Sequence, residues 1–140
     1  MDKEDAKKYL SQVENYNLLI NAKINQLREL DEFKNLIGCK NLDSIHSSNI
    51  GFTSDKTSDN AMKKVILIED IQNDIYNYTL LKNNVINDIA KMDNNIYKKV
   101  LMLRYVEMLT LEEIAVKLKY NYDYVRQIHN KALNKIKEFI

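Results

Sequence analysis

Proline is absent from the whole chain of 140 residues, and glycine occurs only twice. Proline interrupts a helix because it has no amide hydrogen and its ring collides with the preceding turn, and glycine weakens a helix. A chain with so few interruptions has little to stop a helix once it has begun. The sequence therefore predicts an all-α fold, and the spacing of the apolar residues indicates how its helices are arranged.

Two long stretches carry apolar residues near heptad spacing, which predicts a continuous apolar face on each helix. In residues 3–37 they are Ala6, Tyr9, Val13, Tyr16, Ile20, Leu27, Leu30 and Ile37, and Leu10, Leu19 and Ile24 widen the face. In residues 59–91 they are Val65, Ile68, Ile71, Ile75, Tyr78, Val85 and Ile89, followed by Met92. Two such helices should fold back as a long antiparallel, coiled-coil-like hairpin. They bury little core alone, so we expect the hairpin to form a homodimer or to bind a partner.

A flexible loop is predicted between these helices, at about residues 38–58. It holds both glycines, Gly38 and Gly51, and many serine, asparagine, aspartate and threonine residues. These residues favour turns, and their side chains compete with the helix for backbone hydrogen bonds. We therefore expect residues 1–92 to form one domain, the hairpin with its loop, and residues 93–140 to form a second.

The start of a short helix is strongly marked at Thr110-Leu-Glu-Glu113. In this capping box, the threonine hydroxyl accepts the amide of residue 113, and Glu113 reaches back to the amide of Thr110. We expect Leu109 and Ile114 to pack together across the cap. Before this box, Asp93 is expected to cap a helix over residues 94–106.

A second short helix follows a turn at Lys119-Tyr120-Asn121, where Asn121 is the predicted N-cap and Tyr120 is expected to pack against Val125. Val125, Ile128, Ala132 and Ile136 form its inner face. Its outward residues are Tyr122, Asp123, Arg126, Gln127 and Asn130, and Lys131 and Lys135 add a general basic face suited to phosphates. Two amphipathic helices across a tight turn, the second with polar side chains facing outward, predict a helix-turn-helix that binds the major groove.

The charge distribution agrees with this assignment. Residues 91–140 contain ten lysine and arginine residues against six acidic ones, a net charge of +4, although the whole chain has a net charge of only +1. A basic excess on one segment is the electrostatic footprint of a nucleic-acid-binding module. Double-stranded DNA is therefore the expected partner.

Three segments of the last 41 residues resemble region 4 of the sigma-70 family, the helix-turn-helix that reads the −35 promoter element. They are Val100-Leu-Met-Leu-Arg-Tyr, Leu109-Thr-Leu-Glu-Glu-Ile-Ala and Val125-Arg-Gln-Ile-His-Asn-Lys-Ala-Leu-Asn-Lys-Ile-Lys. With its hairpin and polar loop, the whole chain resembles phage-encoded sigma-region-4-like transcriptional regulators, some of which activate late genes. This resemblance implies a transcriptional activator that acts with RNA polymerase.

The resemblance also assigns roles to individual residues. It implies that Arg126 and Gln127 read bases, that Tyr122 and Asp123 hold the first-turn contact positions, and that Arg104, Thr110 and Leu111 contact phosphates. Tyr122 replaces a basic residue of the family, so the DNA sequence recognised should differ from the ordinary −35 element. Helix-turn-helices usually have glycine where Lys119 stands, because the turn residue there adopts positive φ.

Several other functions are not expected from this sequence. Cys39 is the only cysteine, and neither histidine has a partner at ligand spacing, so we predict no metal site, no cofactor and no enzyme. No apolar run is long enough to span a membrane, and a single cysteine suits the reducing cytoplasm.

Two alternatives to a regulator remain open. A DNA-packaging subunit similar to a small terminase also combines a helix-turn-helix with helical oligomerisation; a ring of about eight or more subunits would favour it. A helical interaction scaffold is favoured by the small basic excess, and absence of DNA affinity at low salt would support it.

Overall fold

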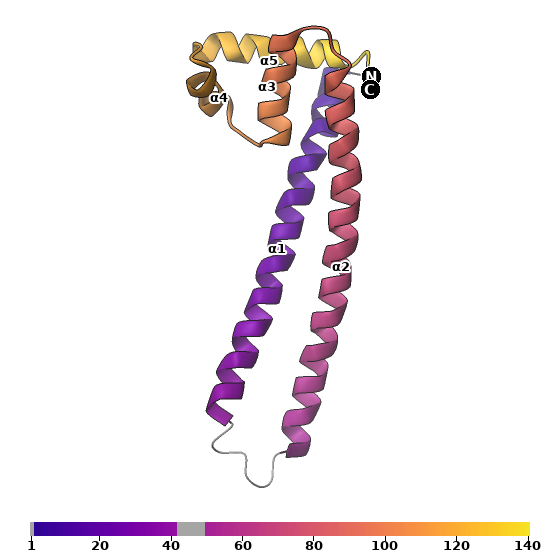
Figure 1. Cartoon of the computed structure of the whole chain (residues 1–140), viewed down its shortest axis with the longest axis vertical. Helices are drawn as coiled ribbons and strands as arrows, with labels where there is room; N and C mark the ends of the chain where they lie inside the picture. Colours follow the sequence, from indigo (N-terminus) through magenta and orange to yellow (C-terminus); the bar gives the residue numbers. More distant parts are fainter. Residues whose placement is uncertain (1, 42–49) are drawn as a thin grey trace. The chain divides into compact units, whose positions relative to one another are not determined.

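The computed structural model describes residues 2–41 and 50–140, and the side chains of residues 2–31 and 59–140. The elements in these ranges are all helical, as predicted: α1 (Lys3–Asn41), α2 (Ile50–Ala90), α3 (Asn95–Leu101), the π-helix η1 (Met102–Val106), α4 (Leu111–Leu118) and α5 (Tyr122–Ile136) (Figure 1). In the part of the chain described, no helix is both long and apolar enough to cross a membrane. The chain forms two compact units, residues 1–17 with 77–140, here the terminal unit, and residues 18–76, here the hairpin unit.

The predicted loop at residues 38–58 is too long, because helix occupies both of its flanks. Helix α1 continues to Asn41 and α2 already begins at Ile50, nine residues before the expected start at residue 59. Residues 42–49 of the predicted loop lie outside the described residues. The turn-forming residues at the flanks cost a helix only tenths of a kcal/mol each, roughly up to 1 kcal/mol for glycine, and no proline stops either helix.

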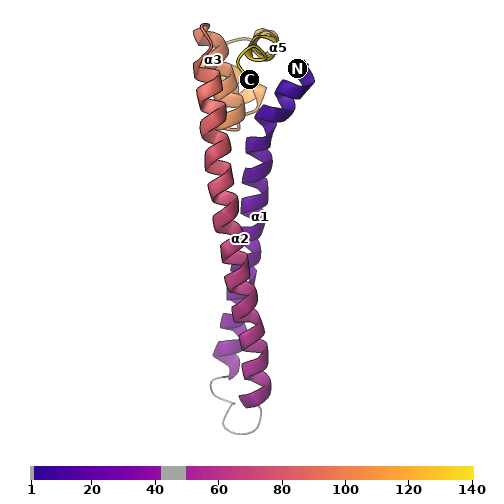
Figure 2. The same cartoon turned by 90° about the vertical axis from the view of Figure 1, so that its right-hand side faces the viewer.

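In the hairpin unit, α1 and α2 run antiparallel and lie side by side in both views (Figures 1 and 2). Two ion pairs join them, Lys23 to Asp74 and Lys64 to Asp31, each with 2.5 Å between nitrogen and oxygen. Asp31 follows Lys23 along α1, whereas its partner Lys64 precedes Asp74 along α2, as antiparallel pairing requires. Lys23 interrupts the apolar face of α1, and its partner on α2 explains how a lysine is accommodated there.

The apolar face predicted for α2 is only partly buried in the hairpin unit. Ile71 is buried, but Val65 and Ile75 of the predicted face are 55% and 44% exposed. Two helices cannot enclose a face as wide as the one the sequence offers, because each covers only one side of its neighbour. The partial burial agrees with the expectation that two such helices bury little core alone.

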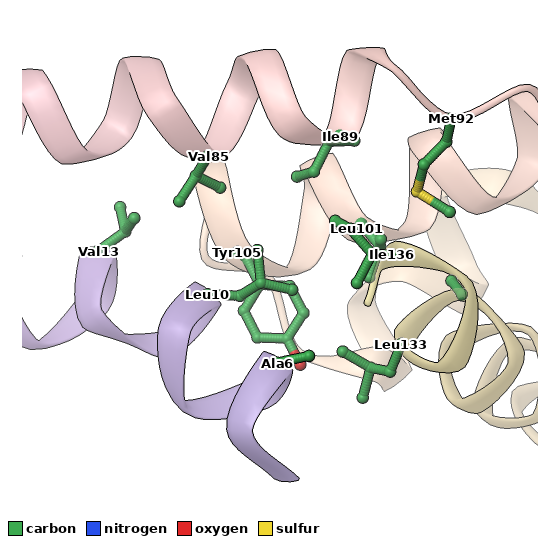
Figure 3. Packing of buried hydrophobic residues seen from close by; sticks show 11 residues of the cluster. Ala6, Leu10, Val13, Val85, Ile89, Met92, Leu101, Tyr105, Leu133 and Ile136 are labelled. Carbon is green, nitrogen blue, oxygen red and sulfur yellow. The ribbon is translucent and has the colours of Figure 1, made fainter. Parts of the chain in front are cut away.

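The larger core of the terminal unit joins the first turns of α1 and the last turns of α2 to the helices near the C-terminus (Figure 3). Its buried members are Ala6, Leu10 and Val13 of α1, Val85 and Ile89 of α2, Met92, Leu101 of α3, Tyr105 of η1, and Ala132, Leu133 and Ile136 of α5. This compact unit extends past the expected boundary between residues 92 and 93. The division of roles between residues 1–92 and 93–140 stays a prediction.

A second core in the terminal unit belongs to the helix-turn-helix itself. It contains Val100, Leu103, Ile114, Ala115, Val125 and Ile128, with Leu109, Leu111 and Leu118 packed against it. The inner face predicted for α5 is confirmed, because Val125, Ile128, Ala132 and Ile136 are all buried. The small residue Ala115 of α4 packs in the same cluster as Val125 and Ile128. Helices α3, η1 and α5 contribute residues to both cores, so these three elements connect the helix-turn-helix to the larger core.

The helix predicted over residues 94–106 has a different start and a different second half. Its N-cap is Asn94, not Asp93, and the Asn94 side chain accepts hydrogen bonds from the amides of Ile96 and Tyr97. After Leu101 the chain continues as the π-helix η1. A π-turn inserts an extra residue into the helix and is often found at functional sites, and here it turns Leu103 to one core and Tyr105 to the other.

Candidate nucleic-acid interface

The predicted cap at the start of α4 is present in a modified form. The Thr110 hydroxyl accepts the amide of Glu113 at 3.2 Å, which confirms the first half of the capping box. The Glu113 carboxylate accepts that same hydroxyl at 3.2 Å instead of the Thr110 amide. Leu109 and Ile114 pack in one core, as expected for the residues that flank the cap. The cap fixes the start of α4 and therefore the position of the turn that follows.

The turn between α4 and α5 is built around Lys119, in the left-handed conformation with φ 60° and ψ 41°. The amide of Tyr120 donates to the carbonyl of Ala115 at 2.9 Å, and the amide of Lys119 donates to that of Val116 at 3.3 Å. This pair of hydrogen bonds is the Schellman arrangement that closes helices with a left-handed residue. The predicted positive φ at Lys119 is confirmed. Met108, φ 63°, is a second such residue and was not predicted.

Substituting Lys119→Gly is expected to stabilise the protein by up to about 1 kcal/mol and to raise the melting temperature by a few degrees. Glycine has no Cβ to clash in the left-handed region, although its greater freedom in the unfolded chain offsets part of the gain. Thermal unfolding followed by circular dichroism measures the change. Lys117→Gly, inside α4, is the control and should destabilise by roughly 1 kcal/mol. A lower melting temperature for Lys119→Gly would contradict the turn described here.

The start of α5 is ordered by a cap and by an aromatic contact. Asn121 has extended backbone angles, and its side chain accepts the Asp123 amide at 2.9 Å, which confirms the predicted N-cap. The expected packing of Tyr120 on Val125 is wrong: Tyr120 is 40% exposed and its ring meets the edge of Tyr124, with centroids 5.3 Å apart. A tyrosine hydroxyl retains water more readily at this exposed edge than within the apolar core around Val125.

All five residues predicted to read bases are exposed on α5: Tyr122, Asp123, Arg126, Gln127 and Asn130. The side chains of Asp123 and Arg126 are 72% and 57% exposed, and a loose ion pair of 3.7 Å joins them. Their opposite charges orient each other without using the full hydrogen-bonding capacity of either group. The helix therefore presents a row of donors and acceptors to its surroundings, and its role in base reading stays a prediction.

The predicted phosphate contacts occupy different environments. Arg104 on η1 is only part-exposed: its guanidinium donates to the Leu109 carbonyl at 3.5 Å and lies 3.8 Å from Glu14 of α1. Lys131 is exposed, and Lys135 pairs with Glu138 at 3.0 Å. Thr110 caps α4 with its hydroxyl, and Leu111 packs against the core. Their backbone amides at the start of α4 are the groups that suit a phosphate best.

A buried polar pair connects α5 to η1. The Tyr105 hydroxyl lies 2.7 Å from Nε2 of His129, and the two rings stack with centroids 5.7 Å apart. Burial, together with the positive charges of Arg104, Lys7 and Lys3, lowers the pKa of His129 to about 4. Burial also raises the pKa of Tyr105 to about 12, so a protonated hydroxyl faces a neutral imidazole. The His129 side chain is buried, the only polar or charged residue in the described part of the chain that is.

Sequence reasoning missed Tyr124, which is 45% exposed in the first turn of α5. Its position beside Asp123, on a helix that starts at Tyr122, was the available signal. Among the described residues no three histidine, cysteine, aspartate or glutamate side chains gather as a metal site would require. His46 and the side chain of Cys39 lie outside the described residues.

Comparison with protein families identifies the segment that carries this surface. Residues 96–138 match the family described as Sigma-70, region 4. The C-terminal segment is a sigma-region-4-like helix-turn-helix. The match begins in α3 and ends just after α5, so it spans η1, α4 and α5 and contains every residue predicted to contact DNA. Comparisons with curated proteins and with solved structures found no match.

The sigma-region-4-like helix-turn-helix is a DNA-binding module of transcription proteins. This agrees with the exposed polar side chains at the start of α5 and with the basic excess of the last 50 residues. The matched segment does not include the hairpin unit, the start of α1 or the end of α2.

Proposed function

We propose that this protein is a sequence-specific regulator of transcription that places α5 in the major groove of double-stranded DNA. The observation that carries the proposal is the exposed set Asp123, Arg126 and Gln127 on a capped helix of a sigma-region-4-like module. Arginine pairs with two acceptors of guanine, glutamine with adenine, and a carboxylate accepts from cytosine. Such a set distinguishes base pairs, whereas lysine contacts to phosphate do not.

We propose further that the protein is an activator that acts with RNA polymerase, in the cytoplasm and in a phage or prophage setting. The support is the likeness of its module to the part of a sigma factor that works at promoters. In this proposal Tyr122 and Asn130 complete the base-reading face. Arg104, the start of α4 at Thr110 and Leu111, and Lys131 with Lys135 hold the backbone, where positive charges and helix amides suit phosphates.

The hairpin unit is proposed to join two copies of the chain or to bind the polymerase. Large apolar side chains are exposed there, among them Leu18, Met62, Val65, Ile66 and Tyr76, each more than half exposed. This exposed apolar surface is available to a partner, and large apolar patches often mark interaction sites. The molecular mass in solution separates the cases, since a dimer supports self-association and a monomer leaves the polymerase as the partner.

Selection of bound fragments from genomic DNA tests the base-reading proposal. The wild-type protein is expected to recover a defined motif, and the Arg126→Ala/Gln127→Ala variant to lose it while keeping weak binding to any DNA. Each lost bidentate contact should reduce discrimination by about 1–3 kcal/mol. Asn134→Ala is a control, because Asn134 is exposed on the same helix but outside the predicted set.

The outcomes separate the possible functions. A motif lost only in the double variant, lying near transcription start sites, supports the proposal, and transcription with purified polymerase then tests activation. Recovery of the same unselective pool by both proteins would reject base reading by α5.

A further inference from the structure

Helix α1 has two edges that face different parts of the terminal unit. Its buried face is formed by Ala6, Leu10 and Val13 (Figure 3). On one edge of this face, the Tyr9 hydroxyl donates to Asp88 of α2 at 2.9 Å. On the other edge, Glu14 lies 3.8 Å from Arg104 of η1, inside the segment that matches Sigma-70, region 4. This second edge therefore faces the DNA-binding module.

Lys3 and Lys7 lie on that same edge of α1. They precede Glu14 by eleven and seven residues, which are three and two helical turns, so the three side chains share one face of the helix. Lys7 is exposed and Lys3 is part-exposed. Their positive charges also act on His129 of α5, which places both lysines near that helix independently of the spacing.

His129 marks the flank of α5 that carries the base-reading face. Arg126 precedes it by one helical turn and Asn130 follows it directly, and both are exposed. The first turns of α1 pack on the core that contains Leu133, one turn further along α5. Lys3 and Lys7 therefore lie on the edge of α1 that faces η1, and their charges act on the buried side chain next to Asn130 of α5.

The charges around this flank have a positive excess. Lys3, Lys7 and Arg104 are opposed by Glu4, whose charge acts on Tyr105, and by Glu14, which pairs with Arg104. Within the Sigma-70, region 4 match, Arg126 is already compensated in part by Asp123. Lys3 and Lys7 therefore add to the positive charge on this side of the module.

We propose that the first turns of α1 belong to the DNA-binding surface, with Lys3 and Lys7 contacting phosphates of the DNA that α5 reads. This inference rests on the proposed function and adds an element outside the matched family segment. The contacts are to the backbone, so they strengthen binding to any duplex and fix the orientation of the module without choosing a sequence.

Fluorescence anisotropy on labelled duplexes tests the inference, using a duplex that carries the selected motif and a scrambled duplex of equal length. The Lys3→Gln/Lys7→Gln variant is expected to lose about tenfold or more in affinity for both duplexes at 0.1 M salt. The slope of log affinity against log salt should fall by roughly 0.9 for each phosphate contact removed. Circular dichroism confirms that the variant is folded.

The matched control is Lys8→Gln/Lys63→Gln, which removes the same charge from exposed positions away from this edge. It should change affinity and slope far less. Equal losses in the two double variants would show a general charge effect and would overturn the inference. An unchanged salt slope in Lys3→Gln/Lys7→Gln, with the motif still recognised by the wild type, would also overturn it while leaving base reading intact. Failure of the wild type to bind any duplex would instead reject the proposed function.

Discussion

Replacing Leu10 with alanine is expected to lower the free energy of unfolding by about 3 kcal/mol and to destabilise the helix-turn-helix together with the hairpin ends. Leu10 has no exposed surface, and it packs in the core that contains Tyr105, Leu133 and Ile136 (Figure 3). A buried leucine truncated to alanine loses its transfer free energy and leaves a cavity in a close-packed interior. Chemical denaturation gives the loss in stability, and hydrogen exchange of the α5 amides shows whether the recognition helix is affected.

The matched control is Leu18→Ala, because Leu18 lies on the same helix but is 61% exposed. Its substitution should change stability by less than about 0.5 kcal/mol. If Leu10→Ala left the exchange of the α5 amides unchanged while it unfolded α1, the shared core would not act as one cooperative unit.

Lowering the pH from about 7 to 4 is expected to destabilise the terminal unit by about 3 kcal/mol through His129 alone. Its pKa in the folded protein, about 4, lies below the ordinary value of 6.5, because the ring is buried and positive charges lie near it. Between these two values the unfolded chain binds a proton that the folded protein does not. The stability contributed by the neutral ring is therefore complete above pH 6.5 and is lost as the pH falls towards 4.

The free energy of unfolding measured at several pH values tests this expectation. The carboxylates of the chain titrate in part of the same range, so the comparison is with His129→Gln, which retains a hydrogen-bonding side chain without titrating. The variant should be less stable at pH 7 but should lose less on acidification. Parallel pH profiles for the two proteins would mean that His129 is not responsible.

Local signals in the sequence predicted the structure correctly where a single residue fixes the local backbone conformation. Thr110 and Asn121 cap the helices they were expected to cap, because a side-chain oxygen next to free amides has one dominant use. The positive φ of Lys119 was expected from the likeness to helix-turn-helices, which usually have glycine at this place in the turn. The exposed positions of α5 followed from the spacing of its buried residues, since a helix of 15 residues has a well-defined inner face.

Features that depend on distant residues were not predictable in the same way. The ends of the predicted loop were wrong because helix continuation, not composition, decided residues 38–41 and 50–58. The π-turn of η1 depends on two cores that Leu103 and Tyr105 enter separately. Burial of His129 requires the Tyr105 hydroxyl, 24 residues away, and nothing in the local sequence near Lys3 or Lys7 indicates that α1 packs on α5.

The shared core also has a consequence for the synthesis of this protein. Residues 3–17 leave the ribosome long before α5, yet the core that covers Ala6, Leu10 and Val13 is complete only when Leu133 and Ile136 are present. Contacts this far apart in sequence form slowly, because a long stretch of chain must first be ordered. Incomplete chains that end before α5 would leave part of this core exposed and would lack the second helix of the helix-turn-helix, so they would be candidates for proteolysis.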